Sequence, residues 1–218
     1  MNNLVSLVFE GEVALFALIV AALVLSLSCH EFGHAWIAKL SGDDTAERAG
    51  RLTLNPVAHI DPMGLLMVLF VGFGYAKPVP TDPRNYRSRR ADLWVAAAGP
   101  GMNLLLAMLA WNFYVSMRLA GVDFFAGWNA EAFFVILVQV NLLLMVFNLI
   151  PLGPLDGTYI LPHLLPRRLA QMYRYYNARF GVWALFALIA AGLLGLPVFS
   201  GLMSFAQSLL PYITFVSL

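Results

Sequence analysis

His30-Glu31-Phe32-Gly33-His34 follows an apolar run, residues 13–28, that contains no charged side chain. Residues four apart share one face of a helix, so both imidazoles of this H-E-x-x-H pattern can reach a single metal ion. Zinc binds histidine nitrogen, and a catalytic zinc keeps one position open for water. Glu31 lies beside the first histidine and can take a proton from that water. The pattern predicts a catalytic site with one zinc ion per chain, held by His30 and His34.

The alternative is that both histidines are buried side chains satisfied by hydrogen bonds, with Glu31 acting as a cap. The membrane setting of the motif favours the metal site. Ionisable side chains at membrane depth are costly, and they usually mark a functional site.

The composition indicates a membrane protein. The chain has 218 residues, of which 61% are hydrophobic and only 11% are charged, whereas about a quarter of the residues in soluble domains are charged. We expect an all-α polytopic membrane protein with about five to six transmembrane helices. The net charge of +1 argues against nucleic acid as a partner. Cys29 is the single cysteine, so it forms no intramolecular disulfide, and we expect it to be a small buried residue.

The apolar runs place the helices. Full-length helices are expected at about residues 12–40, 93–118 and 130–149, and two more over 180–218, divided by Gly195-Leu196-Pro197. The first is predicted to be a retained transmembrane helix, because no positive segment precedes it. Residues 167–179 are predicted to be a basic loop. We expect one domain, residues 1–218, with its catalytic core at about 12–165.

Residues 63–75 are apolar but too short to span, because a spanning helix needs about 20 residues. If this segment re-enters the membrane, twelve of the 13 Lys and Arg residues lie on one side, and only Arg118 lies opposite. The positive-inside rule then places the basic side in the cytoplasm. The irregular backbone near residues 72–80 must line protein or a wet cavity, and an extended edge there can pair with another extended chain. A short spanning helix is the alternative.

The third metal ligand is predicted to come from the end of the helix over 130–149. That helix runs in the same direction as the first one, so Asp156 lies at a similar depth to the histidines. Prolines and glycines at 151–154 break the helix and can turn the carboxylate inward. From spacing alone, Asp156 is either this ligand or a helix cap.

Three features give the chain a family resemblance. They are the H-E-x-x-H motif at 30–34, Ala98-Gly99-Pro100-Gly101-Met102-Asn103 opening the next full-length helix, and Asn148…Pro151…Asp156-Gly157 after the following one. In this order the chain resembles the site-2 proteases, intramembrane zinc metalloproteases that cut membrane-embedded substrates. Residues 54–64 and 76–80 resemble a compact branch of that family, without a PDZ-like or nucleotide-sensing domain.

The resemblance implies that Asp156 is the third zinc ligand and that Glu31 is the catalytic acid and base. It also implies single-span membrane proteins as substrates. We expect a bacterial cytoplasmic membrane, with the active site nearer the cytoplasmic side. Asn148 is predicted to stabilise the oxyanion or to hold the unwound substrate, unless it only bonds its own helix end.

Several other polar and small residues carry expectations. Asn103 is expected to bond a neighbouring helix, and Gly99 and Gly101 to allow close helix packing. His59 is either an additional metal group or a hydrogen-bonded surface residue. His163 is expected at the membrane interface.

Two other functions remain open from the sequence. A metal transporter needs ionisable residues spread along a path, whereas the candidates here gather at one depth. A catalytically silent relative that only binds membrane helices has no need of Glu31 beside the ligands.

Overall fold

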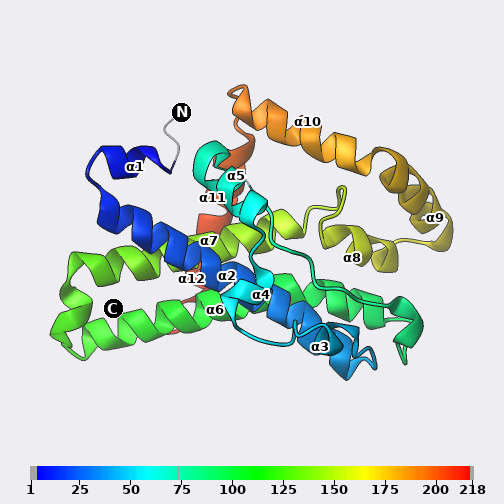
Figure 1. The fold of residues 1–218 in the computed structure, drawn as a ribbon, viewed down its shortest axis with the longest axis horizontal. Coiled ribbons are helices and arrows are strands. Elements are labelled where there is room, and N and C mark those ends of the chain that lie inside the picture. Colours follow the sequence, from blue (N-terminus) through cyan, green and yellow to red (C-terminus); the bar gives the residue numbers. More distant parts are fainter. Residues whose placement is uncertain (1–3, 73, 217–218) are drawn as a thin grey trace.

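The computed structural model describes residues 4–72 and 74–216, and all regular secondary structure in that part of the chain is helical (Figure 1). Four helical stretches are long and apolar enough to cross a membrane: α2 (Val13–Leu40), α6 (Ala91–Leu119), α7 (Trp128–Asn148) and Arg167–Leu193. Two shorter apolar stretches, Pro62–Val71 and Val198–Ile213, accompany them. The predicted all-α polytopic class is confirmed.

The other elements are shorter, and α9, η3 and α10 together make up the stretch Arg167–Leu193. They are α1 (Ser6–Phe9), α3 (Thr45–Arg48), α4 (Pro56–His59), α5 (Pro62–Val71), η1 (Pro83–Asn85), η2 (Asp123–Ala126), α8 (Gly157–Leu164), α9 (Arg167–Tyr176), η3 (Asn177–Gly181), α10 (Val182–Leu193), α11 (Val198–Ser208) and α12 (Leu210–Ile213).

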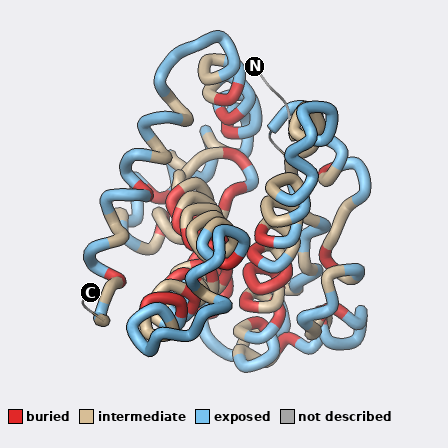
Figure 2. The backbone as a smooth tube through the Cα atoms, turned by 90° about the vertical axis from the view of Figure 1, so that its left-hand side faces the viewer, coloured by how far each residue is buried: buried red, intermediate tan, exposed pale blue. Residues whose placement is uncertain are grey.

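The core lies where α2, α6 and α7 pack against one another. Small residues on these helices are buried and let the backbones approach closely, among them Ala22, Ala35 and Ala107. Figure 2 shows buried positions recurring along the central helices, with exposed positions around the outside. Larger apolar side chains, including Leu137 and Leu142 of α7, fill the remaining space.

Helix α5 enters the structure and the chain then turns back. It has ten residues, so it is about 15 Å long and too short to span a bilayer. It ends at Gly72, whose φ of 79° is typical of a helix C-terminus. The backbone N–H of Lys77 then donates to the carbonyl of His59 at 2.8 Å, so the chain returns to the level at which it entered. The segment therefore re-enters, as the distribution of basic residues predicts.

Gly64 allows this return. A Cβ at Gly64 would lie 2.0 Å from the carbonyl oxygen of Tyr75, so only glycine lets the returning chain lie against α5. The returning residues 74–80 have no regular secondary structure and run as an elongated trace toward the start of α6 (Figure 1). The guanidinium of Arg51, which is 6% exposed, donates to the carbonyls of Lys77 and Pro78 and holds the returning chain from the other side.

The prediction of a loop over residues 167–179 is wrong. The chain is helical there and runs from α9 through the π-helical turn η3 into α10. The charge of the segment suggested a loop, but most of its residues, including Leu169, Ala170 and Met172, are good helix formers. The helix begins directly after Pro166, which suits the start of a helix.

Candidate metal centre

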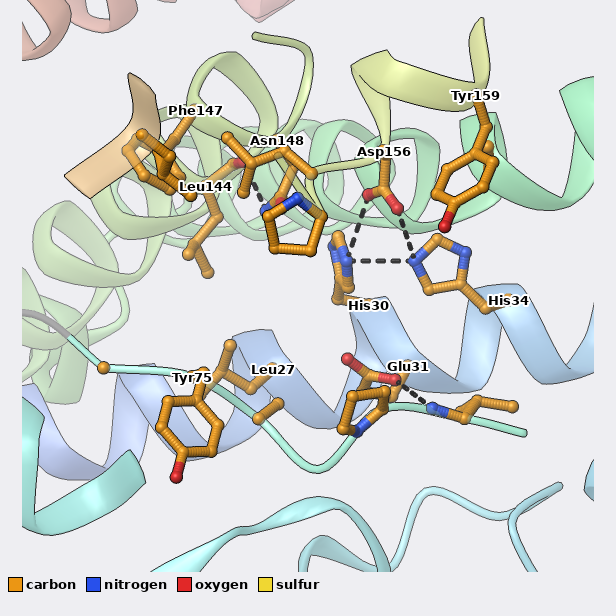
Figure 3. A pocket seen from close by; sticks show the side chains of 18 of the residues that line it. Leu27, His30, Glu31, His34, Tyr75, Leu144, Phe147, Asn148, Asp156 and Tyr159 are labelled. Carbon is orange, nitrogen blue, oxygen red and sulfur yellow. Dashed lines mark hydrogen bonds and ion pairs between the residues drawn. The ribbon is translucent and has the colours of Figure 1, made fainter. Parts of the chain in front are cut away.

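His30 and His34 face the same point from α2, and Asp156 faces it from the start of α8 (Figure 3). The two histidine Nε2 atoms are 3.0 Å apart. Each carboxylate oxygen of Asp156 lies 3.4 Å from one of them, Oδ2 from His30 and Oδ1 from His34. Among the described residues this is the one cluster of three His, Cys, Asp or Glu side chains whose donor atoms all lie within 4.8 Å of one another.

The other ring nitrogens show how the histidines are oriented. His34 Nδ1 lies 2.7 Å from the carbonyl oxygen of Val95, which can only accept, so this nitrogen carries the proton. His30 Nδ1 lies 2.7 Å from Asn103 Oδ1. The amide nitrogen of Asn103 donates to Asn141 Oδ1 at 2.8 Å, which fixes the amide orientation and makes its oxygen an acceptor toward His30.

This arrangement suits a bound cation. With both Nδ1 atoms protonated, both Nε2 atoms direct lone pairs at the same point, together with a carboxylate. Such lone pairs repel one another unless a positive charge lies between them. Two histidines and one carboxylate, each histidine oriented by a hydrogen bond on its far side, form a donor set of the kind used by catalytic zinc sites.

A buried polar network supports His30. Asn103 and Asn141 are 0% exposed, and they bond each other and Ser26 of α2. The expectation that Asn103 bonds a neighbouring helix is confirmed, but its contact with a metal ligand was not foreseen. Asn141 and Ser26 were missed altogether. The signal for Asn141 was an amide in the middle of the apolar helix α7.

Glu31 lies beside the histidines but points to the extended segment below them in Figure 3. Its Oε2 accepts a hydrogen bond from the backbone N–H of Val79 at 3.1 Å. The side chain is 8% exposed and lines the same cavity as His30 and His34. The carboxylate therefore faces the cavity without belonging to the three-donor cluster.

Asp156 does not act as a helix cap. It precedes α8, yet its side chain makes no capping hydrogen bond, and its oxygens face the histidines instead. Oδ2 has no hydrogen-bond partner although it is buried. Of the two readings left open by spacing, the geometry favours the ligand.

Asn148 ends α7 and lines the same cavity. Its Nδ2 donates to the carbonyl of Leu144, one turn earlier in its own helix, at 3.0 Å. The helix-end bond expected as the alternative is therefore present. The oxyanion role of Asn148 stays a prediction.

The cavity beside the cluster has a volume of about 830 Å³. Its lining is mainly apolar and comes from α2, the extended residues 74–81, α7 and α10. Leu27, Tyr75 and Phe147 lie on its walls in Figure 3. The cavity therefore presents an apolar space to one polar wall that carries Glu31 and the histidines.

The other residues singled out in the sequence have different outcomes. His59 is fully buried, not at the surface, and its Nε2 lies 2.7 Å from the carbonyl oxygen of Thr53, outside the three-donor cluster. His163 is partly buried and contacts Asp92 at 3.2 Å. Cys29 is buried and free, as expected.

The two glycines of α6 also differ. A Cβ at Gly99 would lie 2.3 Å from His34 Nε2, so Gly99 gives both imidazoles their space. Gly101 faces open space, with nothing within 4 Å of a Cβ, so close packing at Gly101 was a wrong expectation.

The fold and the site define a metalloprotease of membranes. The profile of peptidase family M50 matches residues 18–127 and 117–189, and the chain belongs to this family. It is an integral membrane protein and a zinc-dependent metalloendopeptidase of the site-2 protease type.

Three relatives show the extent of the similarity. "Putative zinc metalloprotease YwhC" of Bacillus subtilis is 42% identical over 156 residues, covering 70% of this chain and 71% of the relative. "Putative zinc metalloprotease Rip2" of Mycolicibacterium smegmatis is 37% identical over 160 residues, covering 71% and 60%. The protein of the same name from Mycobacterium tuberculosis is 34% identical over 158 residues, covering 69% and 59%. The chain thus spans about three fifths of the mycobacterial relatives. No solved structure matches it.

Proposed function

We propose that this protein hydrolyses peptide bonds within or next to the transmembrane segments of single-span membrane proteins. The observation that carries the proposal is the position of His30, Glu31 and His34 on α2, a helix apolar enough to cross a membrane, facing a mainly apolar cavity. A soluble peptide has no need of such a site. An apolar segment fits it.

His30, His34 and Asp156 would hold the zinc ion, which polarises the substrate carbonyl and lowers the pKa of bound water toward about 7. Glu31, which faces the cavity, would accept the proton of the attacking water and deliver it to the leaving amine. Asn103 and the Val95 carbonyl keep both imidazoles in the orientation that this requires. Asn148 is proposed to donate to the developing oxyanion once its bond to Leu144 is exchanged.

The extended residues 74–80 are the proposed docking edge. A substrate helix shields its own carbonyls, so it must unwind before attack. An unwound segment then needs new partners for its backbone, and an extended edge can supply them. This segment lines the cavity opposite Leu144 and Phe147, and Val79 connects it to Glu31.

The membrane side is part of the proposal. Basic segments 39–51 and 167–179 lie at the right-hand end of the molecule in Figure 1, at α3 and α9, and segment 77–90 runs toward that end and into α6. The last turn of α6, which contains Arg118, lies at the opposite end. We assign the basic end to the cytoplasm, so the metal centre lies toward that side. The relatives named above are bacterial, which supports a bacterial cytoplasmic membrane.

The two alternatives have less support. A transporter needs ionisable side chains along a path, but residues 13–28 of α2 contain none. A silent binder has no use for Glu31 facing the cavity.

The test pairs Glu31→Gln with Glu47→Gln, which changes an exposed carboxylate that pairs with Lys39. Both variants and the wild type are purified in detergent, analysed for zinc, and incubated with a panel of single-span substrates. We expect about one zinc per chain in all three. Cleavage should fall at least about 10²-fold in Glu31→Gln only, because the proton acceptor is lost.

Two results would overturn the proposal. Equal cleavage by Glu31→Gln would remove Glu31 from the reaction. A folded wild type without zinc would remove the metal centre.

A further inference from the structure

The loop that carries Asp156 is held by side chains of α9 and η3, which lie more than 15 residues further along the chain. Asn177 receives a hydrogen bond from the backbone N–H of Gly153 at 3.0 Å and donates its own Nδ2 to the Gly153 carbonyl at 3.2 Å. The hydroxyl of Tyr173 donates to the carbonyl of Pro151 at 2.9 Å. One asparagine thus satisfies both backbone groups of a residue three positions before Asp156.

The contact depends on a close approach of two glycines. Gly153 has a φ of +57°, in the left-handed region that favours glycine, and its Cβ would lie 3.1 Å from the carbonyl oxygen of Gly181. A Cβ at Gly181 would lie 2.1 Å from Asn177 Oδ1. Side chains at either position would push the loop and the helix apart.

The helix is irregular at this point. Residues 177–181 form a π-helical turn between α9 and α10, and such turns are frequent at functional sites. Beyond the turn, α10 lines the cavity with Val182, Leu185 and Phe186. Leu155, next to Asp156, is buried against Leu185. The loop that carries Asp156 therefore contacts this helix at Asn177, where the π-helical turn begins, and at Leu185, beyond the end of the turn.

We propose that Asn177 is a positioning residue for the third metal ligand: by clamping Gly153 it holds Asp156 where His30 and His34 can share a metal with it. The inference rests on the metal site proposed above and deepens it. Pro151 and Pro154 have no backbone N–H. Local bonds are made by the N–H groups of Leu152 and Leu155 and by Thr158 Oγ1, which also donates to the Gly153 carbonyl, and the stretch has further partners outside the loop. Asn177 and Tyr173 are these partners.

A purely structural clamp would affect stability without affecting the metal. The chain offers a matched control in Asn112, which clamps another segment in the same way: its Nδ2 donates to the Ile213 carbonyl at 2.7 Å, and its Oδ1 accepts from the N–H of Phe215 at 2.7 Å. That segment does not include Asp156. Asn112→Ala thus measures the loss of an asparagine clamp as such.

The experiment titrates the metal-free forms of the full-length wild type, Asn177→Ala, Gly153→Ala and Asn112→Ala with Co²⁺, followed by visible absorption, with zinc competition for the affinity. Thermal unfolding of each form is recorded in parallel. Tyr173→Phe, which removes a single hydroxyl, provides a milder variant should Asn177→Ala not fold.

We expect Asn177→Ala and Gly153→Ala each to weaken metal binding by about 10–100-fold, the range found when groups that orient metal ligands are removed. A double variant that combines Asn177→Ala with Gly153→Ala, titrated in the same way, should bind metal little more weakly than either single variant, since both substitutions disrupt one contact. Tyr173→Phe should show a smaller loss in the same direction, and Asn112→Ala should bind metal as the wild type does.

Unchanged affinity in Asn177→Ala, or equal losses in Asn177→Ala and Asn112→Ala, would overturn the clamp and leave the metal site standing. A folded wild type that binds neither Co²⁺ nor zinc would overturn the metal site itself.

Discussion

At the scale of single residues, each histidine of the site bonds the protein through Nδ1 and directs Nε2 toward Asp156 and the other histidine. The Val95 carbonyl oxygen and Asn103 Oδ1 accept hydrogen bonds from the Nδ1–H groups of His34 and His30. Outer partners of this kind fix the tautomer and the ring orientation. The imidazoles also need room. Gly99 supplies it because α6 crosses α2 directly at the two rings.

Gly99→Ala should therefore reduce metal binding. The added methyl group would lie 2.3 Å from His34 Nε2 and 2.6 Å from His30 Cε1, so at least one ring must move. We expect metal affinity to fall at least about 10-fold, measured as zinc retained during dialysis against a chelator. Gly101→Ala is the control, since its methyl group meets nothing within 4 Å, and it should retain zinc and gain about 0.5–1 kcal/mol of helix stability. Equal retention of zinc by both variants would contradict this role of Gly99.

At the scale of elements, the loop after α2 holds the segment that leads into α6. Asp43 is 0% exposed and accepts hydrogen bonds from the backbone N–H of Asp82 at 2.7 Å and from Asn85 Nδ2 at 2.9 Å. Burial opposes ionisation of this carboxyl, but the hydrogen bonds from Asn85, Thr45 and Asp82 outweigh it and lower the pKa of Asp43. One carboxylate thus joins the end of α2 to the segment that leads into α6.

The lowered pKa of Asp43 predicts how stability depends on pH. A group whose pKa is lower in the folded state stabilises that state above its unfolded pKa of about 3.9. This contribution is lost as the pH falls through the folded pKa. We expect Asp43→Asn to cost about 1–3 kcal/mol near neutral pH, with the difference in melting temperature from the wild type shrinking below about pH 4. A difference that is constant across the titration would show that the charge of Asp43 is unimportant.

At the scale of the whole molecule, the two ends differ in charge. The end that carries the basic segments also carries α3, α8 and α9, whereas the turn between α6 and α7 lies at the other end (Figure 1). Since basic loops are retained in the cytoplasm, the orientation of the chain sets the side from which water reaches the site.

Cysteine labelling tests this orientation, because the native Cys29 is buried and gives little background. Ser88 and Asp123 are exposed positions at the two ends. With a membrane-impermeant maleimide, we expect Asp123→Cys to react in intact cells, and Ser88→Cys to react only after lysis. The wild type serves as the unlabelled control, and the reverse pattern would invert the assigned topology.

The sequence by itself determined what depends on local periodicity. The apolar runs predicted α2, α6 and α7 within a few residues, and the four-residue spacing in α2 placed His30 and His34 on one face. The charge pattern also favoured re-entry over spanning for residues 63–75, because a membrane sorts basic residues by side.

Only the tertiary structure decided the contacts between distant segments. The sequence leaves Asp156 as either a cap or a ligand, and the packing of α7 and α8 decides between the two. For Asn141 the sequence shows only a polar residue in an apolar helix, whereas the structure shows its hydrogen bond with Asn103. The structure also showed that Asn177 clamps Gly153. These contacts join positions 24 to 126 residues apart, and the packing of whole helices determines them, whereas local propensity reports only on neighbours within about one turn.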